Sequence, residues 1–190
     1  METAKAFENH PLKYAVEEFS LANSAYLRMV KIGVGNFAEY ERAWREFLHR
    51  IERVWIKTQA AVYHMPNWKK IESGFIELRR EDPLLQYLHQ ARNVEEHSIA
   101  DVAKDWDPHL QVRQGKGIVE LTWEVWDRSL LPVKNRGVVY NPPMSHLGQN
   151  IEHLKRKGKA ELRVIAEFAL RFYCDFLNKV SSEVVGRTDR

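Results

Sequence analysis

The stretch Asp82–Trp106, DPLLQYLHQARNVEEHSIADVAKDW, decides the fold prediction for this chain. It opens with Asp82 and Pro83, a capping side chain followed by proline at the first helical position, which is a strong helix start signal. Apolar residues then recur at helical spacing, which predicts an amphipathic helix that ends before Asp107-Pro108. The apolar stripe consists of Leu84, Leu88, Ala91, Ile99 and Val102.

A dense polar block, Arg92-Asn93-Val94-Glu95-Glu96-His97, stands in the middle of this helix. At about 100° per residue, Arg92 and Glu95 fall on or beside the buried face, and Glu96 is the i,i+4 neighbour of Arg92 on the flank. Asn93 and His97 are i,i+4 neighbours on the outward face. A carboxylate on an apolar stripe is costly unless it is paired. We therefore expect Glu95 to meet an arginine of a neighbouring helix, such as Arg42, Arg45 or Arg53.

Helical periodicity recurs on both sides of this stretch. Residues 12–30 and 36–66 each place apolar side chains on one face, and Asn36 with Glu39 resembles a capping box at the start of the second segment. A shorter helix is expected after Asn67, with Gly74 weakening its middle. The last helix is expected to start at Ser145, to continue to Val180 and to kink near Gly158.

The pattern changes from helical to alternating in residues 110–143. Residues 118–126 alternate apolar and polar side chains, which predicts a strand. A second strand pair is expected at 130–133 and 137–140, with Asn135-Arg136-Gly137 as a hairpin turn. We therefore predict a mainly α fold, a four-helix-type bundle with a small antiparallel β insertion between the third and last main helices, in a single domain covering residues 1–190.

Composition limits the class of protein. The 190 residues carry a net charge of +3, which permits nucleic-acid binding without requiring it. The single cysteine, Cys174, excludes an intramolecular disulfide and is expected in the core beside Phe172 and Phe176. No apolar run approaches the roughly 18 residues that span a bilayer, and the first residues lack a signal pattern. A cytoplasmic protein without a membrane segment is expected.

The polar block resembles the R-N-x-x-x-H signature of the HEPN superfamily, with Arg92, Asn93 and His97 at the matching positions. Members of that superfamily are α-helical bundles that often dimerise so that two copies of the motif face each other. The resemblance implies a metal-independent endoribonuclease or nucleotide-processing protein of a toxin or phage-defence system. It further implies no cofactor, a homodimer, RNA as a substrate, and an antitoxin or other protein as a partner.

The chemistry of such a site is coherent. His97, as an imidazole, can exchange a proton with the RNA 2′-hydroxyl or the leaving oxygen. Arg92 can stabilise the charge that develops on the phosphorane, and Asn93 can orient the imidazole or a phosphate oxygen. Glu95 and Glu96 would support them. The only concentrated basic run, Lys155, Arg156, Lys157 and Lys159, could hold phosphates, although a solvated helix face explains it equally well.

Other interpretations use the same residues. Arg92 and Glu96 could form an ordinary helix ion pair. In a non-catalytic helical interaction or ligand-binding module, Arg92 and Glu95 would organise the core and the hairpin would bind a partner. A straight helix also separates Arg92 from His97 by about 140°, so one subunit alone would not bring both to one phosphate unless the helix distorts. A metal site of His146 with Glu152 or His153 is conceivable, but no spacing is as tight as in known zinc motifs. The loop 140–146 could border a pocket.

Overall fold

The protein is mainly α-helical in a computed structural model that describes residues 10–32, 36–97, 111–115, 118–122, 132–151 and 161–185. For residues 37, 94–97, 111–115, 118–122, 184 and 185 only the backbone is described. Within this part of the chain, five α-helices and a short π-helical turn are found. They are α2 (Lys13–Ile32), α3 (Phe37–Val62), α4 (Trp68–Glu81), α5 (Pro83–His97), α7 (Leu162–Val180) and η1 (Ser181–Val185).

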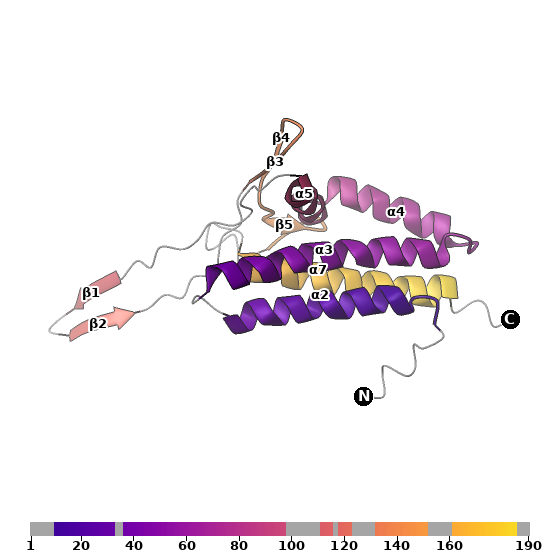
Figure 1. The fold of residues 1–190 in the computed structure, drawn as a ribbon. Coiled ribbons are helices and arrows are strands. Elements are labelled where there is room, and N and C mark those ends of the chain that lie inside the picture. Colours follow the sequence, from indigo (N-terminus) through magenta and orange to yellow (C-terminus); the bar gives the residue numbers. More distant parts are fainter. Residues whose placement is uncertain are drawn as a thin grey trace.

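Three long helices form the body of the bundle. Helices α2, α3 and α7 lie side by side, and α5 is seen nearly end-on where it crosses them (Figure 1). Helix α4 joins α3 to α5 and packs against α5. The predicted helical bundle is therefore confirmed.

The helix starts show which capping predictions hold. The side chain of Asn36 accepts a hydrogen bond from the backbone N–H of Glu39 at 3.1 Å, as the capping pattern predicted. Asn67 also occupies an N-cap position, but its side chain makes no cap. It donates instead to the backbone carbonyl of Glu183 at 3.2 Å. This bond fastens the start of α4 to the end of the last helical segment.

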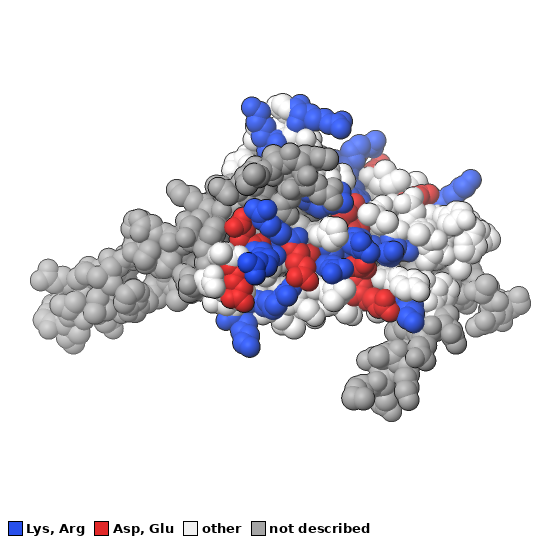
Figure 2. All heavy atoms as spheres, viewed as in Figure 1, with Lys and Arg blue, Asp and Glu red and all other residues white. Residues whose placement is uncertain are grey.

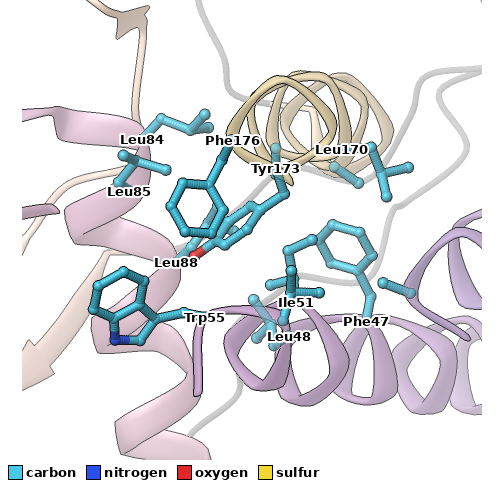
Figure 3. Close-up of a cluster of buried hydrophobic side chains, with 14 of the residues drawn as sticks. Phe47, Leu48, Ile51, Trp55, Leu84, Leu85, Leu88, Leu170, Tyr173 and Phe176 are labelled. Carbon is cyan, nitrogen blue, oxygen red and sulfur yellow. The ribbon is translucent and has the colours of Figure 1, made fainter. Parts of the chain in front are cut away.

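Aromatic and aliphatic side chains of α2, α3, α4, α5 and α7 form the core. Figure 3 shows the part of it that lies between α3, α5 and α7. Phe75 lies at the centre of the aromatic part, with ring centroids 4.3 Å from Trp55 and 4.4 Å from Phe176. Burying each such side chain contributes roughly 1.5–3 kcal/mol relative to leaving it exposed. Cys174 was predicted to join this core, and that prediction is wrong, because its side chain is exposed. Its neighbour in the sequence, Tyr173, is buried instead.

Ion pairs connect α2 to α3 at the surface that the two helices form together. Glu18, almost fully buried, binds Arg50 at 3.0 Å and Arg53 at 2.6 Å, and Arg28 pairs with Glu46. Burial alone would raise the pKa of Glu18, but the two arginines outweigh it and lower that pKa. Figure 2 shows positive and negative side chains interleaved over this face, so its cations are largely neutralised by neighbours.

The β insertion lies between α5 and α7, as predicted, and consists of antiparallel hairpins. The strands are β1 (Gln111–Gly115), β2 (Ile118–Thr122), β3 (Val133–Asn135), β4 (Val138–Tyr140), β5 (Ser145–His146) and β6 (Gln149–Asn150). Arg136 and Gly137 have φ angles of 47° and 83°. Two positive φ angles between paired strands are typical of a type I′ turn, so the predicted hairpin turn is confirmed.

The predicted start of the last helix at Ser145 is wrong. Ser145 and His146 belong to the third hairpin, and the insertion reaches Asn150 rather than residue 143. Leu147 and Gly148 have φ angles of 48° and 74°, which a right-handed helix does not accommodate. Helix α7 begins only at Leu162. The predicted kink at Gly158 lies outside the described residues.

Candidate functional site

One buried carboxylate fixes where α5 begins and what lies beside it. The side chain of Asp82 accepts from the backbone N–H of Leu85 at 3.0 Å and of Leu147 at 2.6 Å. It also lies 3.0 Å from Nδ1 of His146. Burial alone would raise the pKa of Asp82, but these three hydrogen bonds outweigh it and lower that pKa. Asp82 therefore starts α5 and joins it to the hairpin β5–β6.

The first two motif residues lie where the buried face of α5 meets solvent. Ala91 is completely buried, whereas Arg92 and Asn93 are half-buried. Nη1 of Arg92 donates to the side-chain oxygen of Asn93 at 3.3 Å. The amide nitrogen of Asn93 lies 3.2 Å from Nε2 of His89, one helical turn earlier. Arg92, Asn93 and His89 thus form a continuous polar row on α5.

A second group of charged side chains lies near the other ring nitrogen of His89, Nδ1. Nη2 of Arg79, on α4, donates to both carboxylate oxygens of Glu52, on α3, at 2.9 and 2.7 Å. The same nitrogen lies 2.7 Å from Nδ1 of His89, and Nδ1 is 3.6 Å from Glu52. The Arg79 guanidinium also lies 5.9 Å from the ring centroid of Trp55. His89 therefore lies between Arg79 and Glu52 on its Nδ1 side and Asn93 on its Nε2 side.

Glu52 stays ionised in this arrangement. Only 9% of the residue is exposed, and burial alone would raise its pKa. His89 and the positive charge of Arg79 outweigh burial and lower the pKa of Glu52 from 4.5 to about 2. At 3.6 Å the His89 nitrogen is beyond direct hydrogen-bond distance, so the two bonds from Arg79 hold the carboxylate most firmly.

Glu52, Arg79 and His89 border an open polar cleft of about 480 Å³. Helices α3, α4 and α5 form its walls, and Tyr140 of the hairpin β3–β4 closes one side. Asn135 of that hairpin donates to the side-chain oxygen of Gln90 at 2.7 Å, which fixes the hairpin against α5. The predicted pocket-bordering role of the loop 140–146 is confirmed at Tyr140. The cleft offers a solvent-accessible imidazole, His89, backed by a buried ion pair.

Most of the other predicted site residues lie partly or wholly outside the described part of the chain. The backbone of α5 continues helically through Glu95, Glu96 and His97, but their side chains lie outside the described part. The predicted pairing of Glu95 with an arginine therefore concerns a side chain outside the described part. Arg53, one of the expected partners, binds Glu18. The basic run at residues 155–159 also lies outside the described residues. The conceivable metal ligand His146 binds Asp82, and Glu152 and His153 are not described.

Sequence reasoning missed three residues of the cleft. His89 had a signal, because it precedes Asn93 by four residues and so lies on the same helical strip. Glu52 and Arg79 come from two other helices, and nothing in their local sequence connects them with α5. Their role follows only from packing.

Comparison of the chain with protein-family models, curated proteins and solved structures finds no match in any of the three. Among the described helices, none is both long and apolar enough to cross a membrane. Within the same residues, three or more His, Cys, Asp or Glu side chains do not gather in a group that could hold a metal ion.

Proposed function

We propose that the protein is a HEPN-like, metal-independent endoribonuclease or nucleotide-processing protein of a toxin or phage-defence system, acting in the cytoplasm. The observation that carries the proposal is the polar row on α5, in which the half-buried Arg92 and Asn93 are joined to His89, a residue that lines the open cleft. Helix α5 extends to His97, whose backbone lies one helical turn after Asn93.

Arg92 would stabilise the charge that develops on a scissile phosphate, and His97 would exchange the proton of the attacking or leaving oxygen. Asn93, bonded to both Arg92 and His89, would fix the position of the guanidinium. No step requires a metal ion. Arg79 and Glu52 would have a supporting role, because both lie close to Nδ1 of His89 and so help to fix the position of its ring.

The test is cleavage of RNA in EDTA by the purified protein and by Arg92→Ala and His97→Ala. Matched controls are Arg28→Ala, on the exposed side of α2, and His64→Ala, exposed beyond the end of α3. We expect both motif variants to lose at least a hundredfold in rate and both controls to retain full activity. Equal cleavage by the motif variants would contradict the site assignment. Cleavage by none of the proteins would favour a non-catalytic binding module.

A second experiment tests whether two subunits share one site. In a straight helix Arg92 and His97 project about 140° apart, so we propose that one copy supplies the arginine and its mate the histidine. Co-expression of Arg92→Ala with His97→Ala then produces heterodimers with one intact site. Activity should return to about a quarter of wild type, because half of the dimers are mixed and each has one of two sites. Unrestored activity in verified heterodimers would contradict a shared site.

A further inference from the structure

A second cavity, of about 420 Å³, lies between α4 and α7 and is separate from the polar cleft. Its walls are mainly aromatic and aliphatic. They include Phe75 on α4 and Phe168, Phe172 and Phe176 on α7. A mainly apolar cavity of this size with a few polar groups is typical of small-molecule sites.

Aromatic side chains span the space between the two helices beside the cavity. Phe75 reaches across to Phe172 and Phe176, with ring centroids 5.5 and 4.4 Å apart. Gly74, next to Phe75, lines the cavity, and a Cβ atom at that position would have no atom within 4 Å. Glycine inside a helix costs about 1 kcal/mol relative to alanine. No packing requirement in the described residues explains that cost, and its effect is to keep the cavity open.

The two ends of the cavity differ in charge. The bond from Asn67 to Glu183 places the start of α4 against the end of α7, so the two helices run antiparallel along the cavity. Lys70, early in α4, and Lys179, late in α7, therefore lie towards the same end. Neither lysine forms an ion pair within the described residues.

The opposite end is apolar. His146 and Leu147 of the hairpin β5–β6 line it, with the His146 ring edge-on to Phe168 and Phe172 at 6.1 and 5.6 Å. The nitrogen Nδ1 of His146 is already engaged by Asp82. Along the middle, Arg171 pairs with Glu167, and Asp175 is the one carboxylate among the residues that line the cavity. The two lysines therefore lie together at one end of the cavity, with Asp175 one helical turn before Lys179.

We propose that this cavity binds a medium-chain aliphatic carboxylic acid, with its carboxylate between Lys70 and Lys179 and its alkyl chain directed towards Phe168 and Leu147. The complementarity is twofold. An ionised head group meets two cations at one end, and an alkyl chain meets phenyl rings and aliphatic side chains at the other. This site does not depend on the proposed nuclease activity, since it shares no residue with the polar cleft.

The test is calorimetric titration of the full chain with straight-chain carboxylates of six to twelve carbons, each kept below its micelle concentration. Each added methylene should raise the affinity about fourfold until the cavity is filled, because burying a CH₂ group is favourable. Decanol, which lacks the charge, should bind at least tenfold more weakly than decanoate. The absence of saturable binding, or equal binding of the alcohol, would overturn the proposal.

Two variants locate the site without relying on loss of folding. Gly74→Leu places a side chain into the open space while replacing a poor helix former with a good one, so it should abolish decanoate binding at an unchanged or raised melting temperature. Lys70→Gln together with Lys179→Gln should reduce decanoate affinity at least tenfold and leave decanol affinity unchanged. Wild-type affinity for decanoate in a folded Gly74→Leu protein would show that the ligand binds elsewhere and would refute the assignment.

Discussion

Replacing Glu52 by glutamine should remove a large, pH-dependent part of the stability. A carboxyl whose pKa falls from 4.5 to about 2 on folding contributes about 3 kcal/mol to the free energy of unfolding at neutral pH. This contribution is complete above the unfolded-state pKa and is lost as the pH falls from 4.5 towards 2. At pH 3.5 about 2 kcal/mol of it remains, and at pH 2.5 less than about 1 kcal/mol.

The measurement is urea unfolding of wild type and Glu52→Gln between pH 7 and pH 2.5. The variant should be less stable by about 3 kcal/mol at pH 7, which for a chain of this length lowers the melting temperature by roughly 6–12 °C. The difference should shrink as the pH falls. Glu77→Gln is the matched control, because Glu77 is exposed on α4, and it should change stability by less than about 0.5 kcal/mol. A difference that stays constant from pH 7 to pH 2.5 would refute the role assigned to the Glu52 carboxylate.

Three further changes test the packing. Asp82→Asn should lower the free energy of unfolding by about 2–4 kcal/mol and speed hydrogen exchange of the Leu147 amide, because one amide oxygen cannot replace two ionised acceptors; unchanged exchange at Leu147 would contradict this. Phe75→Ala should cost about 3–5 kcal/mol in urea unfolding, since the ring is only 3% exposed and contacts Trp55; a cost below 1 kcal/mol would argue against a packed aromatic centre. Glu18→Gln should lower the free energy of unfolding by about 1–3 kcal/mol at pH 7 and by less at pH 3. The lowered pKa of Glu18 stabilises the fold only while the carboxylate is ionised, and this contribution is lost as the carboxylate becomes protonated; thermal melts at both pH values measure the difference.

The elements that local signals specify were predicted well. Apolar periodicity located α2, α3, α4 and α5, and Asn36 and Asp82 cap the helices at which their sequence context placed them. The turn at Arg136 and Gly137 was also predictable, because glycine after a turn residue favours positive φ. Each of these features depends on residues within about four positions of one another.

The start of the last helix was not predictable in this way. Leu147 and Ile151 fit a helical stripe, yet the segment forms a hairpin. Asp82, 65 positions before Leu147 in the chain, accepts the Leu147 N–H, and Ile151 donates to the Met144 carbonyl at 2.9 Å. A contact across that separation leaves no periodic trace in the sequence around Leu147, so the local pattern predicted the wrong structure.

The candidate site also combines features that the local sequence specifies with features that depend on long-range packing. By itself the sequence determined the helix α5, the adjacency of Arg92 and Asn93, and the helical spacing from Asn93 to His97, because backbone geometry fixes i,i+4 neighbours. Only the tertiary structure decided that Glu52 and Arg79 meet His89. Three helices must pack before a carboxylate, a guanidinium and an imidazole come within hydrogen-bond distance. The same holds for the cavity beside Gly74, because its walls come from α4, α7 and the hairpin β5–β6, which meet only when the chain folds.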